Sequence, residues 1–223
     1  MNVQPSLEQM AAETRLNHQK MGDDLFRSIW HYFGLPSEYI QKIRVLNDKP
    51  FDKEFTFFVA KAVVIDILEN RDLNGLLFEI IFHRCSRLDK DALRELDVII
   101  GSLIDSKDPF PAFIRFCAIL SDFILFLRCK GNFLNIDRQR LLLYWIEYYE
   151  GYFEEQIEDS GGLKRLLNAA HKKASIYPYS FLKNFTFRYC NPDLPYNKEN
   201  IPFLFETELH RKFKSLEPIF LAE

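Results

Sequence analysis

Apolar residues recur along this chain at the three- and four-residue spacing of α-helices, and short polar turns separate the periodic stretches. An amphipathic helix buries such positions on one face, so the pattern predicts a mainly α protein, a multi-helix bundle of about eight helices. Phenylalanine supplies much of the apolar surface, with 22 Phe against 8 Gly among 223 residues. Each fully buried ring stabilises a fold by roughly 1.5–3 kcal/mol. The predicted helices cover residues 6–31, 37–46, 52–70, 73–87, 90–104, 111–130, 137–158, 163–175 and 204–216.

The helix predicted over residues 111–130 is apolar almost all round, which indicates the centre of the bundle. Its most apolar part, Phe116–Leu127, has 12 residues, whereas a membrane span requires about 20. We therefore expect a buried helix of a soluble protein and no contact with a membrane. Asp122 is the only carboxylate in this helix. An unpaired buried charge is costly, so we expect Asp122 to pair with Arg115, two turns earlier.

The clearest break in the chain is the sequence Ser160-Gly161-Gly162. Paired glycines end a helix and loosen the connection that follows. We expect a helical bundle over residues 1–160 and a C-terminal helical subdomain, residues 161–223, packed on it. The second part contains a short, irregular, proline-rich excursion at residues 176–202, and periodicity does not decide whether this excursion is strand, helix or loop.

Cysteine spacing and the N-terminal residues indicate the cellular compartment. The four cysteines include no Cys-x-x-Cys pair, which is typical of reduced thiols and not of a disulfide framework or a zinc site. The first residues lack a basic region followed by an apolar run, so we expect a cytoplasmic location.

No glycine-rich phosphate loop, Gly-x-Ser-x-Gly or His-Glu-x-x-His sequence occurs in the chain. Glu79 and His83, one helical turn apart, supply only half of a metal site. These observations favour a non-enzymatic protein without cofactor or metal.

An acidic stripe is the first candidate site. Between residues 137 and 160 the chain has seven acids and two bases, and like charges this close attract a partner of opposite sign. The stripe predicts a face that binds another protein with a basic surface, as an immunity or antitoxin protein would. A solvated helix face is the simpler alternative. The carboxylates of the stripe follow one another at spacings of three, four and four, the spacing of a single helix face, and are Glu147, Glu150, Glu154 and Glu158.

The basic aromatic segment 163–190 is the second candidate. No acid occurs from Gly161 to Pro192, and aromatic residues alternate with six fixed positive charges in this range. Single-strand binders combine stacking rings with cations that hold phosphates, so the segment predicts RNA binding as the alternative function. Packing of the rings on the main domain is the simpler reading. The candidate nucleic-acid contacts are Lys172, Lys173, Tyr177, Tyr179, Lys183 and Arg188.

Arg165 and His171 lie within this segment as an Arg-x5-His sequence. The spacing resembles the Arg-x4-6-His motif of the HEPN ribonucleases, although Leu166 stands where that family usually has a polar residue. The resemblance implies an all-helical homodimer that cleaves RNA, with His171 as acid and base at the 2′-hydroxyl and Arg165 stabilising the phosphate. A surface histidine is the competing interpretation.

Overall fold

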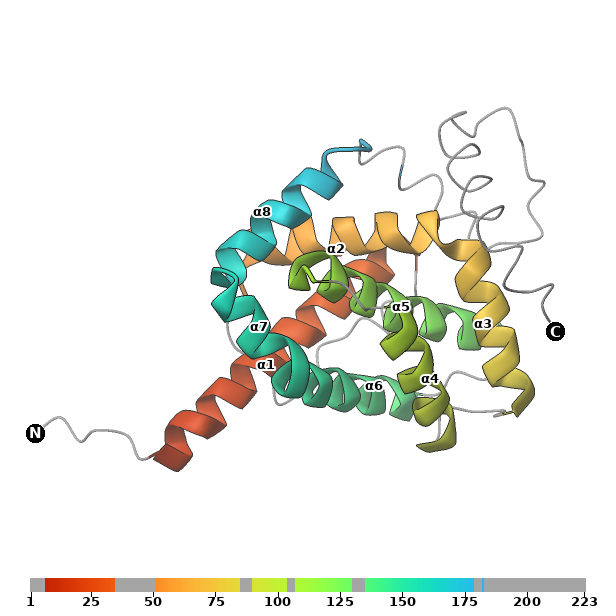
Figure 1. Cartoon of the computed structure of the whole chain (residues 1–223), viewed down its shortest axis with the longest axis horizontal. Helices are drawn as coiled ribbons and strands as arrows, with labels where there is room; N and C mark the ends of the chain where they lie inside the picture. Colours follow the sequence, from red (N-terminus) through yellow and green to blue (C-terminus); the bar gives the residue numbers. More distant parts are fainter. Residues whose placement is uncertain are drawn as a thin grey trace, which may run out of the picture.

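The computed structural model describes residues 7–34, 51–84, 90–103, 107–129, 135–178 and 182. All regular structure within these ranges is helical, which confirms the predicted mainly α class (Figure 1). The predicted helices 37–46 and 204–216 and most of the segment 176–202 lie outside the described residues. The helices are α1 (Leu7–Tyr32), α2 (Lys53–Glu69), α3 (Arg71–Arg84), α4 (Lys90–Leu103), α5 (Pro109–Cys129), α6 (Asn135–Tyr148), the π-helix η3 (Tyr149–Phe153), α7 (Glu154–Asp159) and α8 (Gly162–Ala174).

The helix at the centre of the bundle is α5, as its apolar sequence predicts. It packs against α1, α2, α3, α4, α7 and α8, and Figure 1 shows it in the middle of the ribbon. Of the described helices, α5 alone has the length and apolar content of a membrane span, over Pro109–Leu127, and 83% of that stretch is buried inside the bundle. Packing within the bundle therefore accounts for the apolar surface of α5.

The buried helix α2 begins where the sequence predicts. Asp52 caps it, because one carboxylate oxygen accepts from the backbone N–H groups of Glu54 at 2.8 Å and Phe55 at 3.0 Å. A cap of this kind satisfies backbone donors that the helix itself leaves unpaired. α1, α5 and α8 then cover α2, so most of its side chains from Phe55 to Leu68 are buried.

Gly22 sets the distance between α1 and α6. A Cβ atom at this position would lie 2.8 Å from Leu142 Cδ1 and 2.8 Å from Trp145 Cε3. Trp145 is fully buried, stacks on Tyr149 at 5.1 Å between ring centroids and donates from Nε1 to Cys117 Sγ over 3.3 Å. The missing side chain of Gly22 thus allows α1, α5 and α6 to close around one tryptophan.

A π-helix interrupts the single helix predicted over residues 137–158. The chain runs as α6 to Tyr148, as η3 from Tyr149 to Phe153, and as α7 from Glu154. A π-turn holds one more residue than an α-turn and changes which positions face the core. In this register both Tyr149 and Phe153 are buried. The predicted long helix is therefore present from Asn135 to Asp159, but its periodicity contains no signal for the extra residue of the π-turn.

The turn between α7 and α8 needs glycine. Gly161 has φ 109° and Gly162 has φ 72°, and side chains are strained in this left-handed region. Beyond the turn, α8 packs along α2 and adds Leu166 and Ala170 to the main core. The predicted boundary between residues 1–160 and 161–223 falls at this turn.

Candidate functional site

The acidic stripe is divided between an inner and an outer set of carboxylates. Two inner ones, Glu150 on η3 and Glu154 on α7, face α1 and hold His18 between them. His18 Nδ1 lies 3.0 Å from Glu150 Oε1, and His18 Nε2 lies 3.3 Å from Glu154 Oε1. Arg15 approaches the second oxygen of Glu150 at 3.7 Å, and the His18 ring packs at 5.0 Å on Tyr149. Glu150 and Glu154 are therefore engaged by α1.

The outer carboxylates of the stripe have no such counter-charge. Glu147 and Glu158 are exposed, as are their neighbours Glu155 and Asp159. None of these four has an ion-pair partner in the part of the chain that the structure describes. From residue 141 to 163 the chain has six acids and no base, so this side of α6, η3 and α7 has a strongly negative potential.

Two large apolar side chains lie exposed among the outer carboxylates. Leu143 is 48% exposed and Tyr152 is 42% exposed. Tyr152 follows Glu147 by five residues, and the chain between them enters η3. The wider turn of a π-helix brings residues at this spacing towards the same side of the helix. We call the set Leu143, Glu147, Tyr152 and Glu155 the acidic-aromatic face. A regular helix places Leu143 in line with Glu147, four residues later, but places Tyr152 off the line of the glutamates, so the sequence pattern did not indicate Tyr152.

A row of tyrosine rings supports the acidic-aromatic face from beneath. Tyr144 and Tyr148 lie 6.0 Å apart, and Tyr148 and Tyr152 lie 5.7 Å apart, between ring centroids. The Tyr144 hydroxyl donates to Asp97 on α4. Burial and the bond to Asp97 both raise the pKa of Tyr144, so this hydroxyl stays protonated and keeps its bond. The ring of Tyr152 thus packs on Tyr148 on one side while the rest of it is exposed.

The basic aromatic segment is only partly available to a ligand. Lys172 is exposed, and Tyr177 is half-buried against the core. Lys173 is bound inside the bundle, where its Nζ donates to Asp66 at 2.9 Å and Glu69 at 2.8 Å. The remaining predicted contacts, Tyr179, Lys183 and Arg188, lie outside the described residues.

The structure gives Arg165 and His171 different surroundings. Arg165 folds back over the start of α8 and donates to the backbone carbonyl of Ser160 at 2.8 Å. His171 stacks on Phe58 of α2 at 3.5 Å between ring centroids and approaches Glu54 at 3.5 Å. Six residues of α-helix separate the two by about 9 Å along the axis and about 120° around it. Within one chain they do not converge on a common point.

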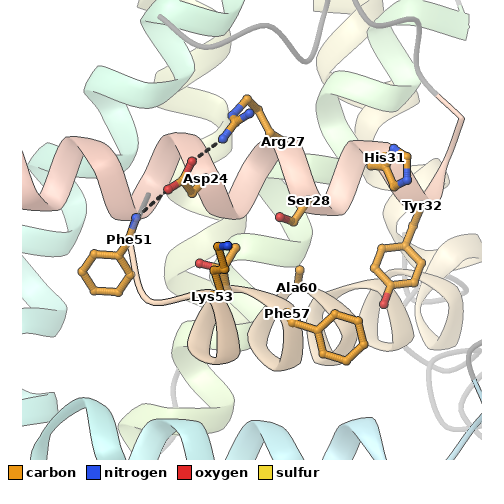
Figure 2. Close-up of a pocket in the computed structure, with 10 residues that line it drawn as sticks. Asp24, Arg27, Ser28, His31, Tyr32, Phe51, Lys53, Phe57 and Ala60 are labelled. Carbon is orange, nitrogen blue, oxygen red and sulfur yellow. Dashed lines mark hydrogen bonds and ion pairs between the residues drawn. The ribbon is translucent and has the colours of Figure 1, made fainter. Parts of the chain in front are cut away.

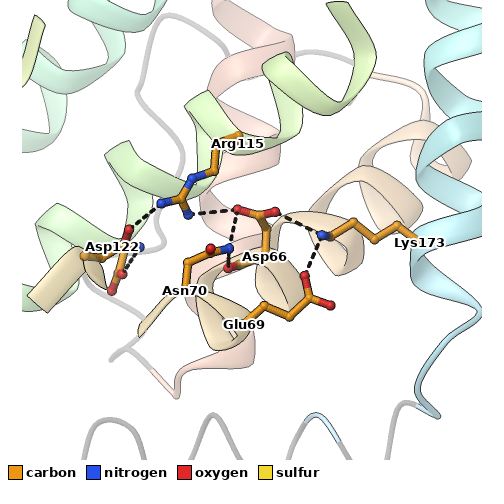
Figure 3. Close-up of polar contacts among 7 residues, drawn as sticks. Asp66, Glu69, Asn70, Arg115, Asp122 and Lys173 are labelled. Carbon is orange, nitrogen blue, oxygen red and sulfur yellow. Dashed lines mark hydrogen bonds and ion pairs between the residues drawn. The ribbon is translucent and has the colours of Figure 1, made fainter. Parts of the chain in front are cut away.

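A polar network crosses the core where α2, α3, α5 and α8 meet, and Figure 3 shows it spread on either side of Asp66. Arg115 donates to Asp66 at 3.0 Å and to Asn74 at 2.7 Å. Asn74 in turn donates to the buried Asp122 at 2.6 Å. Asn74 thus links the predicted pair Arg115 and Asp122. Asp66 was not predicted, although a carboxylate within the apolar run of α2 was a signal for a buried polar contact.

The charges in this network shift the pKa of two members in opposite directions. Burial alone would raise the pKa of Asp66, but the positive charges of Lys173 and Arg115 and their hydrogen bonds hold it below its ordinary value. Burial would lower the pKa of Lys173, but Asp66 and Glu69 raise it. Both groups therefore stay charged near neutral pH, and the network pins α8 to α2.

No cluster of three potential metal ligands occurs among the side chains that the structure describes. The side chains of Glu79 and His83 lie outside that part. Comparison of the chain with models of protein families, with curated protein sequences and with solved structures gives no match.

Proposed function

We propose that this protein is a non-enzymatic, cytosolic protein-binding module that captures a partner with a basic surface through the acidic-aromatic face. The observation that carries this proposal is the exposure of Leu143 and Tyr152 among carboxylates without a counter-charge. An immunity or antitoxin protein, which must cover a basic target, is the class that this chemistry suits best.

The composition of the face favours a protein as the partner. Tyrosine is enriched at protein interfaces because it supplies a large contact area at low cost in conformational entropy. The Tyr152 ring packs on Tyr148, and a contact of this kind restricts the side chain and lowers that cost further. Glu147 and Glu155 add long-range attraction for cations and raise the rate of encounter with a basic surface.

The RNA-binding alternative has less support from the geometry. Lys173 is paired with Asp66 and Glu69, and one N–H of Arg165 donates to the Ser160 carbonyl. Lys172 is then the one fixed charge of the predicted nucleic-acid contacts that is exposed in the described part of the chain.

A pull-down with the tagged full-length chain tests the proposal. The bait is incubated with native lysate, with and without nuclease, and captured proteins are identified by mass spectrometry. We expect one protein at near-stoichiometric amount in both conditions, and its loss when Glu147→Lys and Glu155→Lys are combined. Capture of RNA, or of proteins that nuclease releases, would contradict the proposal and support the alternative.

Matched variants separate the acidic-aromatic face from other exposed groups. Glu13 on α1 is exposed and carries the same charge, so Glu13→Lys should leave capture unchanged. Tyr152→Ala should weaken capture, whereas Met10→Ala, which removes another exposed apolar side chain, should not. Equal losses of capture in the face variants and the controls would show that capture depends on net charge or general surface chemistry, and would contradict the proposal.

A further inference from the structure

A cavity of about 380 Å³ lies between α1 and α2 (Figure 2). Its volume falls within the range of about 300–1,000 Å³ that is usual for small-molecule sites. Ser28 on α1 and Ala60 on α2 are among its lining residues. Because both side chains are small, the two helices leave space between them at this point although they pack closely elsewhere.

Aromatic rings form much of the wall of this cavity. Tyr32, Phe51 and Phe57 line it, and Figure 2 shows Tyr32 extending from the end of α1 towards α2 and Phe57. Phe57 is 45% exposed, and its ring is held edge-on by Phe58 at 5.0 Å between centroids. A flat aromatic ligand would cover Phe57 and stack on the wall.

Asp24, the one carboxylate among the described residues that line the cavity, already has hydrogen-bond partners. Asp24 accepts from Arg27 with one oxygen and from the backbone N–H of Phe51 with the other, over 2.8 Å. Arg27 Nε also lies 3.2 Å from Asp23. Both oxygens of Asp24 therefore accept hydrogen bonds within the fold, from Arg27 and from the backbone of Phe51.

Two nitrogen-bearing side chains lining the cavity, the ammonium of Lys53 and the imidazole of His31, have no such partner in the described ranges. Lys53 and His31 are exposed, and neither forms an ion pair within the ranges that the structure describes. The ammonium group of Lys53 thus places a positive charge beside the rings. An anionic group on a ligand would bind there by charge-assisted hydrogen bonds.

We propose that the cavity between α1 and α2 binds a small aromatic anion, with its ring against Tyr32 and Phe57 and its carboxylate, sulfonate or phosphate group at Lys53 and His31. This site is separate from the acidic-aromatic face on α6, η3 and α7, so the two proposals stand or fall independently. Occupation of the cavity would bridge the end of α1 to the start of α2 and stabilise their packing.

Fluorescence titration of the full-length chain with anilinonaphthalene sulfonate tests this proposal. The probe is an aromatic sulfonate that fluoresces when it leaves water, and phenylnaphthylamine is its uncharged analogue. We expect saturable binding at one site, and about tenfold weaker binding of the uncharged analogue. Lys53→Gln should weaken binding of the sulfonate by about the same factor without affecting the analogue. Lys107→Gln, a matched exposed lysine far along the chain, should change neither.

Filling the cavity provides the second arm of the test. Ser28→Trp should abolish binding, Ser28→Ala should preserve it, and far-UV circular dichroism with a urea midpoint establishes that each variant is folded. If Ser28→Trp proves unstable, Phe57→Ser takes its place in the test. This variant changes an exposed side chain and should weaken the binding of both probes. Absence of saturable binding by the parent, equal affinity for the two probes, or full binding by folded Ser28→Trp or by Phe57→Ser would overturn the proposal.

Discussion

Lys173 on α8 donates to Asp66 on α2 over 2.9 Å, although 107 residues separate them in the chain. The same ammonium group donates to Glu69 at 2.8 Å. Arg115 on α5 donates to the other oxygen of Asp66. Because Asp66 is buried, salt screens its contacts with Lys173 and Arg115 less than it screens pairs at the surface. The contact with Asp66 therefore binds Lys173, which the sequence predicted to contact RNA, to α2 within the bundle.

Replacing Lys173 should destabilise the fold. Lys173→Met keeps much of the apolar stem but leaves Asp66 and Glu69 without the ammonium, and we expect a loss of about 1–3 kcal/mol in the free energy of unfolding. Arg115 still pairs with Asp66, which limits the loss. Urea denaturation measures it, with the exposed neighbour Lys172→Met as the control. Equal stability of the two variants would contradict the role given to Lys173.

The stability contributed by Asp66 should depend on pH in the acid range. Its pKa is lower in the folded protein than in the unfolded chain, so between these two values the unfolded state binds more protons. The contribution is complete above the unfolded pKa of about 3.9 and disappears as the pH falls through the folded pKa. Urea denaturation of the parent and Asp66→Asn at acid and neutral pH should give a stability difference that shrinks on acidification. A difference independent of pH would be inconsistent with the assigned charge state.

Gly22 and Gly75 should respond in opposite ways to alanine. Gly22→Ala places a methyl group 2.8 Å from Trp145 and Leu142, and overpacking of this kind costs about 1–3 kcal/mol. A Cβ at Gly75 in α3 would meet nothing within 4 Å, so Gly75→Ala should stabilise the protein by up to about 1 kcal/mol through helix propensity. Thermal and urea unfolding measure both changes. Unchanged stability of Gly22→Ala would contradict the close packing of α1 on α6, and a loss at Gly75 would contradict the open space beside α3.

Cys117 should be inert in the folded protein. Burial raises the pKa of its thiol to about 12, although the hydrogen bond from Trp145 acts in the opposite direction. The reactive thiolate is therefore scarce at neutral pH and is shielded from reagents. Peptide mapping after iodoacetamide treatment should find Cys117 unmodified in buffer and modified in concentrated urea. Rapid modification of the native protein would place this part of α5 at the surface.

Helix positions and the central helix could be predicted from the sequence because local signals determine them. Asp52 is a capping residue directly before an apolar run, and the same side chain caps α2 in the structure. The apolar sequence of α5 gave its central position, since a helix without a polar face must be enclosed. Gly161 and Gly162 marked the turn that has positive φ values.

The rest depends on contacts between distant residues or on local irregularity. The pairing of Asp66 with Lys173 joins helices whose spacing in the chain carries no information about their distance. The π-helix at Tyr149–Phe153 changes the position of Tyr152 around the helix relative to Glu147. A prediction that assumes 3.6 residues per turn does not include this change. His18 is separated from Glu150 by 132 residues, so the sequence did not predict which carboxylates of the acidic stripe are bound by α1.

The most direct measurement of the central claim is the association rate of the captured partner with the purified full-length chain at increasing salt concentration. If the acidic-aromatic face steers a basic surface, the rate for the parent falls steeply with salt, because counter-ions screen Glu147 and Glu155. The combined Glu147→Lys and Glu155→Lys variant should then associate more slowly and with little dependence on salt. Equal rates and equal salt dependence for the parent and this variant would contradict the account.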